Sequence, residues 1–178
     1  MFRIMRKEAL RPKVTLYEIE APLVARKAQP GQFIILRVDE NGERIPITIH
    51  DYDREKGTVT IIVQTAGATT EKLKRLNEGD SIQDFVGPLG KATETEGKKK
   101  VCIVGGGVGC AIAYPVLKKF HESGADLYIT EIDDTEKEAD VFFPAINKDV
   151  WEEKSRECHS TDEKHLYSYS FVNYERID

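Results

Sequence analysis

The sequence has few cysteines, no long apolar run and no basic excess, and each shortage excludes a class of protein. Its three cysteines, Cys102, Cys110 and Cys158, match no metal-binding spacing. No apolar stretch approaches the roughly 20 residues that a membrane-spanning helix needs. The formal net charge of the 178 residues is -5. A nucleic-acid-binding surface, which needs clustered basic residues, is therefore not expected.

The N-terminal residues also lack the continuous apolar segment of a signal peptide. We therefore predict a cytoplasmic protein that contacts neither a membrane nor nucleic acid. An odd number of cysteines in a reducing compartment predicts free thiols. The pair Cys158-His159, with His165 nearby, lacks a second close cysteine, so no metal site is predicted.

Residues 1–96 are predicted to form a β-rich domain. Short segments rich in β-branched and aromatic residues alternate with turn residues. The predicted strands are 15–22, 32–40, 45–53 and 57–65. Asn41-Gly42 is predicted to form a tight hairpin turn with a positive φ. One helix is predicted over 69–79, and strands at this spacing are typical of a closed barrel or a sandwich.

Residues 101–178 are predicted to form a second domain, joined to the first by the polar segment 91–100. Over 101–133 the sequence predicts a strand, a glycine-rich turn, an amphipathic helix and a strand, which is a βαβ unit with parallel strands. Pro115 is expected within the first turns of that helix, where its missing N–H does least harm. After an irregular segment at 141–155, alternating residues predict a final antiparallel strand within 165–176 with one buried face.

Three motifs in the first domain point to one ligand that has both a phosphate and a flat ring. Residues 43–49 place Arg44 and Thr48 on one strand, where a guanidinium can bind a diphosphate and a hydroxyl can face a ring. Residues 64–70 combine a glycine, which permits close approach, with threonines at a helix start that favours anions. Residues 84–91 are predicted to form a rigid turn that would be a wall of the pocket. Each motif alone is also explained by surface charge, turns or helix caps, but their order and spacing favour a shared ligand.

The glycine-rich sequence GGGVG, at 105–109, lies between a predicted strand and a predicted helix. Such a turn brings backbone N–H groups and a helix N-terminus to a phosphate. Cys110 stands in the place of a third glycine, so the G-x-G-x-x-G fingerprint of dinucleotide-binding folds is absent. A phosphate-binding turn and a plain strand-to-helix turn both stay open on this pattern.

Residues 1–122 resemble the ferredoxin–NADP reductase superfamily. Four motifs in family order carry the resemblance: 30–49, 63–73, 85–91 and 101–115. The most similar branch contains the small subunits of NADH-dependent ferredoxin:NADP oxidoreductase and sulfide dehydrogenase, and the electron-transfer subunit of dihydroorotate dehydrogenase. The resemblance implies a Greek-key FAD-binding β-barrel followed by a nucleotide-binding α/β domain.

The resemblance also implies site residues. It places Pro46, Ile47 and Thr48 against the flavin ring, with the Thr48 hydroxyl, the candidate catalytic group, near the reactive edge. Val63 and Gln64 would lie beside the flavin or its ribityl chain. The residues implied for the FAD diphosphate are Arg44, Gly67, Ala68, Thr69 and Thr70. Those implied for NAD(P)H are Gly105, Gly106, Gly107, Val108 and Gly109.

The sequence departs from the family pattern in two places. Ile45 stands where many relatives have arginine, and Arg44 comes one residue earlier, so its side chain faces the other side of the strand. The family's nicotinamide domain also runs on, and in this branch it carries a [2Fe–2S] centre. Because such a centre needs about four thiolates, three scattered cysteines exclude it, and the α/β domain is predicted to be short and incomplete.

Residues 125–176 resemble instead the C-terminal end of dihydrofolate reductase. The resemblance is carried by LYITEID, FFP, the single tryptophan and a last strand ending in YER. It implies that Thr130 matches a threonine that supports the folate-site carboxylate in that family. The two resemblances meet near 105–127, and the chain is therefore predicted to be a chimera.

Three functions follow from these resemblances. The first is an FAD-dependent NAD(P)H oxidoreductase of the electron-transfer subunit type, which passes electrons to a larger catalytic subunit or works by self-association. The second is a dihydrofolate-reductase-like protein that binds NADPH. The third is a folded hybrid without activity.

Overall fold

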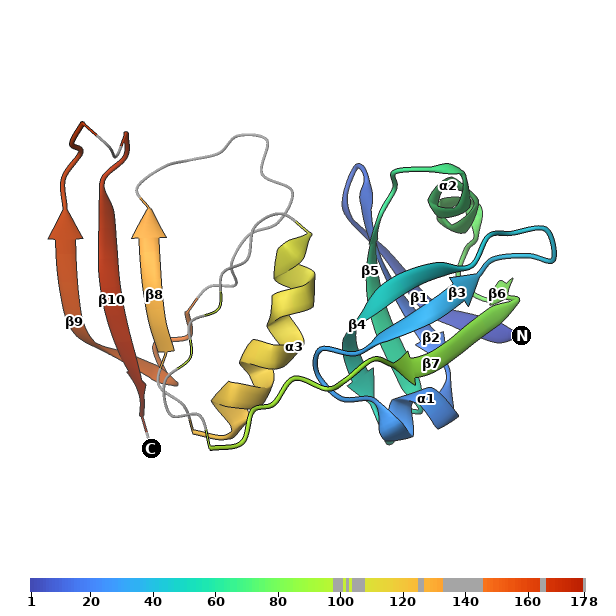
Figure 1. Ribbon diagram of the computed structural model, residues 1–178, viewed down its shortest axis with the longest axis horizontal. Coiled ribbons are helices and arrows are strands. Elements are labelled where there is room, and N and C mark those ends of the chain that lie inside the picture. Colours follow the sequence, from blue (N-terminus) through green and yellow to red (C-terminus); the bar gives the residue numbers. More distant parts are fainter. Residues whose placement is uncertain are drawn as a thin grey trace.

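The fold consists of a β-barrel, a long helix and a small β-sheet, and Figure 1 shows the helix α3 standing between the other two parts. The computed structural model describes residues 1–97, 101, 103, 108–124, 127–132, 146–163 and 166–177. The predicted linker, at 91–100, lies partly outside these residues. The predicted barrel is confirmed, and it precedes the helix and the sheet in the chain.

Seven antiparallel strands form the barrel, in the spatial order β6-β1-β2-β5-β4-β3-β7. Their bounds are β1 (Phe2–Arg11), β2 (Val14–Glu20), β3 (Phe33–Arg37), β4 (Ile45–Asp53), β5 (Thr58–Gln64), β6 (Ser81–Ile82) and β7 (Asp84–Leu89). The prediction of a rigid turn over 84–91 is therefore wrong for 84–89, which form a strand by pairing with β3. Side chains alternate between the two faces of a strand. Tyr17, opposite Ile61 in the β2–β5 pair, therefore points inward together with its partner, and both are buried.

Two short helices flank the barrel, α1 (Pro22–Lys27) and α2 (Ala68–Arg75), at opposite ends in Figure 1. Pro22 was expected to end a strand but begins α1, where its missing N–H removes no helical hydrogen bond. Val24 and Ala25 of this helix are buried in the barrel core. Leu73 of α2 is fully buried in the same core. Both helices therefore belong to the folded barrel.

The loop between β3 and β4 differs from the predicted tight turn. It spans residues 38–44, and Gly42 is absent from the residues that have a positive φ. The Asp39 carboxylate instead accepts the N–H of Asn41 at 3.0 Å, and the Asp39 carbonyl accepts the N–H of Gly42 at 3.0 Å. A loop of this length can reverse the chain without the left-handed conformation that a two-residue hairpin requires.

The C-terminal part comprises α3 (Gly109–Glu122), β8 (Leu127–Ile132), β9 (Trp151–His159) and β10 (Tyr169–Arg176). The strands form an antiparallel sheet in the order β8-β10-β9. The predicted final strand is confirmed, with Val172 and Tyr174 buried and Phe171 exposed on the other face.

The C-terminal part differs from one prediction, and residues of a second prediction lie mostly outside the described residues. The segment 141–155 was predicted to be irregular, but β9 begins at Trp151. Its side chains are mostly polar and exposed, and pairing with β10 rather than apolar patterning forms the strand. The first strand of the predicted βαβ unit, with the glycine turn, lies mostly outside the described residues. Within them, β8 pairs only with β10, and this pairing is antiparallel.

Pro115 lies in the seventh position of α3, deeper than expected. In an α-helix the N–H of residue i bonds the carbonyl of residue i−4. Pro115 has no N–H, so the carbonyl of Ala111 lacks its usual helical donor. The proline therefore leaves one acceptor available on a buried turn of the helix.

We predict that Leu73→Ala lowers the free energy of unfolding by about 2–5 kcal/mol, because it opens a cavity between α2 and the barrel. The matched control is Leu23→Ala on α1, whose side chain is 74% exposed and which should change stability by less than about 0.5 kcal/mol. Urea denaturation followed by circular dichroism measures both. Equal losses in the two variants would contradict the placement of α2 in the core.

Candidate functional site

The outer face of β4 is the surface on which the predicted ring-binding residues lie. Ile49 is fully buried and Ile47 packs partly against the core, so both point inward. The alternating residues Pro46 and Thr48 therefore point out of the barrel, Pro46 exposed and Thr48 half-buried. The strand thus presents a ring-sized polar and apolar surface outside the core.

The start of α2 lies open beside this strand. Gly67 precedes the helix in extended backbone, and no side chain caps the helix. The Thr70 hydroxyl oxygen accepts the N–H groups of Ala66 and Gly67, at 2.9 and 3.0 Å. The N–H groups of the first helical turn have no acceptor within the helix, and they form the positive end of its dipole. This arrangement favours an anion.

Gly67 leaves space in front of that helix start. A Cβ atom built at Gly67 would meet nothing within 4 Å. Gly57 differs, because it has a φ of +70° and a Cβ there would lie 3.0 Å from the Cβ of Pro22. The fold therefore requires glycine at position 57, whereas at position 67 glycine keeps a surface clear.

Two contacts fix α2 beside the start of β4. The Thr69 hydroxyl donates to the Glu43 carboxylate at 3.3 Å, and Thr69 is buried. The Lys72 ammonium donates to the Asp39 carboxylate at 2.9 Å, which lowers the pKa of that carboxyl. The structure thus places the start of α2, which holds the predicted residues 67–70, beside the loop that leads into β4.

Arg44 faces a carboxylate. Its Nη2 atom lies 3.1 Å from Oδ2 of Asp84, which also forms an ion pair with Arg37 at 2.6 Å. The Arg44 side chain is 59% exposed, so this ion pair contributes little to stability. The guanidinium is therefore held by Asp84 and would have to share its donors with any phosphate.

The two predicted residues of β5 lie differently from each other. Val63 is buried in the barrel core, so its side chain is not available to a ligand on the outside. Gln64, the next residue, is exposed at the end of the strand. Only the main chain of Val63 stays a candidate for contact with a ligand.

The other end of β4 lies against the start of α3. Nδ1 of His50 lies 2.8 Å from the carbonyl oxygen of Ala111, and the His50 ring stacks on that of Tyr114. Among the predicted nucleotide-binding residues, Val108 precedes the helix and Gly109 begins it. Gly105, Gly106 and Gly107 lie outside the described residues. The exposed surface of β4 is thus bounded by the N-termini of two helices.

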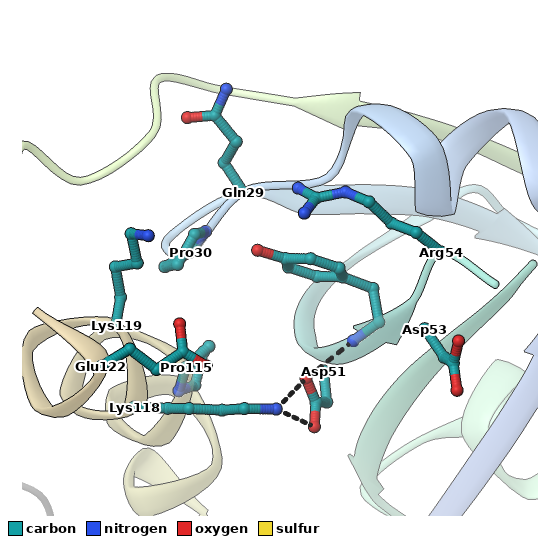
Figure 2. Close-up of a pocket in the computed structure, with 10 residues that line it drawn as sticks. Gln29, Pro30, Asp51, Asp53, Arg54, Pro115, Lys118, Lys119 and Glu122 are labelled. Carbon is teal, nitrogen blue, oxygen red and sulfur yellow. Dashed lines mark hydrogen bonds and ion pairs between the residues drawn. The ribbon is translucent and has the colours of Figure 1, made fainter.

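A cleft of about 420 Å³ lies between the barrel and α3, beyond His50. Its lining residues are Gln29, Pro30, Asp51, Tyr52, Asp53, Arg54, Pro115, Lys118, Lys119 and Glu122. Figure 2 shows the Lys118 ammonium directed at the Asp51 carboxylate across this cleft. Burial disfavours the charge of Lys118, but the hydrogen bond and charge of Asp51 outweigh it and raise the Lys118 pKa. The sequence interpretation missed this pair.

Metal sites and membrane-spanning helices each have their own structural features. Within the part of the chain that the structure describes, no three His, Cys, Asp or Glu side chains gather as they would around a metal ion. The same residues include no helix that is long and apolar enough to cross a membrane. Cys110 and Cys158 are free thiols.

Comparisons with known proteins give two different relationships. The family model for dihydrofolate reductase matches residues 58–176, about two thirds of the chain. That span includes β5, α2, β6 and β7 of the barrel as well as the whole C-terminal sheet.

Curated relatives give the other relationship. An uncharacterized protein from the adh 3' region of Clostridium beijerinckii is 48% identical over 163 residues, covering 86% of this chain and 51% of its own length. A homologue of the electron transfer subunit of dihydroorotate dehydrogenase B from Thermotoga maritima is 42% identical, over 70% of this chain and 44% of its own length. The chain therefore spans about half the length of these relatives.

Solved structures agree with these relatives. The structure of NADH-dependent reduced ferredoxin–NADP oxidoreductase is 42% identical over 70% of this chain and 45% of its own, with a TM-score of 0.68. The ferredoxin reductase of carbazole 1,9a-dioxygenase, 15% identical over 68% of this chain and 38% of its own, has a TM-score of 0.61 and shows the fold alone.

The two relationships overlap along the chain. The relative from Clostridium beijerinckii aligns with 86% of this chain. An alignment of that length includes β8, whichever terminus of the chain it leaves out. The dihydrofolate reductase match, in turn, begins within the barrel. That a reductase-like part and a dihydrofolate-reductase-like part join at one point near 105–127 therefore stays a prediction.

We predict that Gly67→Ser leaves the melting temperature unchanged or slightly raised, because serine is a good helix N-cap and meets no atom there. The matched control, Gly57→Ser, should lose about 1–2 kcal/mol, because it forces a side chain into the left-handed region. Thermal unfolding measures both. A large loss in Gly67→Ser would show that the fold itself requires this glycine.

Proposed function

The chain belongs to the dihydrofolate reductase family over residues 58–176, yet we propose that it is an electron-transfer flavoprotein. The reason is that its barrel has the fold of the FAD-binding ferredoxin reductases. One observation carries the proposal. The uncovered face of β4 lies between the open start of α2 and the start of α3. A ligand with a flat ring and a diphosphate matches this arrangement.

The residues around this face fit FAD. Pro46, Ile47 and Thr48 supply the strand against which the ring would lie, and Gln64 is exposed at the end of β5. Gly67, with Ala68, supplies a clear approach to the N–H groups of the first turn of α2, where the dipole favours the diphosphate. Bound FAD supplies hydride and single-electron chemistry, which protein side chains lack.

Each side chain at this face has a definite task. The Thr48 hydroxyl, on the outer face, would donate a hydrogen bond to the reactive edge of the ring and hold it in place. The Thr70 hydroxyl already holds the turn at 66–67, so that turn is ordered before a ligand arrives. Arg44, released from Asp84 or shared with it, would add charge beside the diphosphate.

NAD(P)H would approach from the α3 side. We assign its phosphates to the turn at 105–109, at the N-terminus of a 14-residue helix. In this proposal residues 1–96 form the FAD-binding domain and residues 101–178 a partial nicotinamide-nucleotide-binding domain. Because the relatives include an electron transfer subunit, a larger catalytic subunit is the proposed partner, with self-association as the alternative, in the cytoplasm.

A second candidate function follows from the family match. The dihydrofolate reductase model extends over all three strands of the C-terminal sheet. A dihydrofolate-reductase-like protein that binds NADPH is therefore the alternative, with Thr130 at the folate site. A hybrid that folds and binds neither ligand is the third outcome of the experiments below.

We predict that the purified chain binds FAD with quenching of flavin fluorescence and that Gly67→Ser weakens this binding about 10-fold or more. The serine would occupy the space that the diphosphate needs, without a loss of stability. Fluorescence titration at constant ionic strength measures the dissociation constants, with Leu23→Ala as the control. A colourless protein that leaves flavin fluorescence unquenched rules the flavoprotein out.

For the alternative function, a methotrexate-type antifolate should raise the melting temperature in proportion to the logarithm of its concentration. Differential scanning fluorimetry with and without NADPH measures the shift. If the flavoprotein proposal is right, FAD raises the melting temperature and the antifolate does not. The absence of a shift with saturating antifolate removes the alternative.

A further inference from the structure

An extra residue in β4 places two adjacent polar side chains on the same face of the barrel. Ile49 is paired with Ile61, and Asp51 is paired with Thr60, so His50 has no partner on β5. This is a β-bulge, in which one strand has one more residue than the other. Consequently His50 and Asp51 both project outward, while Ile49 before them and Tyr52 after them pack against the core.

The first of these side chains binds a carbonyl that the helix leaves free. His50 Nδ1 lies 2.8 Å from the carbonyl oxygen of Ala111, which lacks its helical donor because Pro115 has no N–H. A carbonyl oxygen only accepts hydrogen bonds, so Nδ1 carries the proton and donates it. The His50 ring also stacks on Tyr114, with ring centroids 4.8 Å apart.

The second side chain, Asp51, forms a charged pair with α3 about two turns beyond Ala111. Both carboxylate oxygens of Asp51 accept from the Lys118 ammonium, at 3.0 and 2.9 Å. Figure 2 shows this pair bridging the barrel and α3. Residues 111, 114 and 118 lie three and four positions apart, so they share one face of α3. β4 is accordingly a barrel strand against which α3 packs.

We infer that the His50–Asp51 bulge is a clamp that positions α3, and with it the helix start at Val108 and Gly109, relative to the flavin face of β4. This inference rests on the proposed function. His50 and Thr48 lie on the same face and about 6–7 Å apart along the strand. The clamp therefore acts within one side-chain length of the surface where hydride transfer would take place. His50 and Asp51 are positioning residues in this scheme, and neither touches a reacting atom.

The clamp has a kinetic consequence. Hydride transfer requires the donor and acceptor atoms to approach closely, and a misplacement of about 1 Å can slow such a step about 100-fold. Loosening the clamp should therefore slow the reduction of bound FAD by NADH or NADPH. It should leave FAD affinity unchanged within about 2-fold, because the contacts proposed for FAD lie on β4 and α2.

The test compares four variants of the full chain with a fifth variant as control. His50→Leu removes the donor to Ala111, and His50→Asn keeps a donor at a similar position. Asp51→Lys places two cations together, and the double variant Asp51→Lys/Lys118→Asp restores an ion pair of reversed polarity. Lys119→Met is the matched control, because Lys119 is the exposed neighbour of Lys118 on the same helix.

Two measurements separate the clamp from the proposed function. Hydrogen exchange of α3 in the protein without ligand should speed up in His50→Leu and Asp51→Lys, return toward the wild-type rate in His50→Asn and the double variant, and stay unchanged in Lys119→Met. Anaerobic stopped-flow reduction of bound FAD should be slowed about 10-fold or more in the same two variants and recover in the same two rescues.

Each result has a definite meaning. Unchanged exchange of α3 in His50→Leu and Asp51→Lys overturns the clamp. Faster exchange with an unchanged rate of flavin reduction overturns its positioning role. A wild-type chain that binds no FAD overturns the proposed function, whereas faster exchange in the same experiments still supports the clamp as the contact that holds α3 on the barrel.

Discussion

The hydrogen bond from His50 to the carbonyl of Ala111 and the neighbouring ion pair of Asp51 with Lys118 join the barrel to α3, and each of these contacts depends on a local irregularity. The bulge in β4 turns Asp51 to the outer face beside His50 without moving the neighbouring apolar residues out of the core. Pro115 removes the helical donor to Ala111 and leaves its carbonyl in need of one. A regular strand would have turned Asp51 toward the core, and an uninterrupted helix would have supplied its own donor to the Ala111 carbonyl. The position of the C-terminal part relative to the barrel follows from this contact and the adjacent ion pair.

Burial is unevenly distributed between the two parts of the chain. The barrel contains the single large hydrophobic cluster found among the described residues, and α1 and α2 contribute to it. In the C-terminal part, the buried apolar residues that the structure describes are few: Ala111, Pro115, Phe120, Val172 and Tyr174. Local opening free energies follow buried apolar contacts, so α3 and the sheet are expected to open more readily than the barrel. A contact that fixes α3 on β4 therefore matters more than its own small energy indicates.

The chain is similar both to reductases and to dihydrofolate reductase, and its structure likewise contains two separate antiparallel sheets. The barrel forms its strands from antiparallel neighbours and completes its own core. The C-terminal sheet is also antiparallel, and its central strand is the last one in the sequence. Within the described residues, no strand pair connects the two sheets. The parts thus meet through α3, the element that both the reductase-like and the dihydrofolate-reductase-like sequences include.

The sequence alone determined the barrel strands with strong apolar alternation. The predicted range 45–53 coincides with β4, and 57–65 differs from β5 by one residue at each end. It did not identify β1 or β9, because their side chains are mainly polar and the strands exist through pairing with β2 and β10. A period of two continued from Ile49 would also point residue 51 inward, although the adjacent polar pair His50-Asp51 interrupts the alternation. Only the tertiary structure decided this, because a bulge is defined by the register of two strands distant in sequence and the freed carbonyl needs a donor from another element.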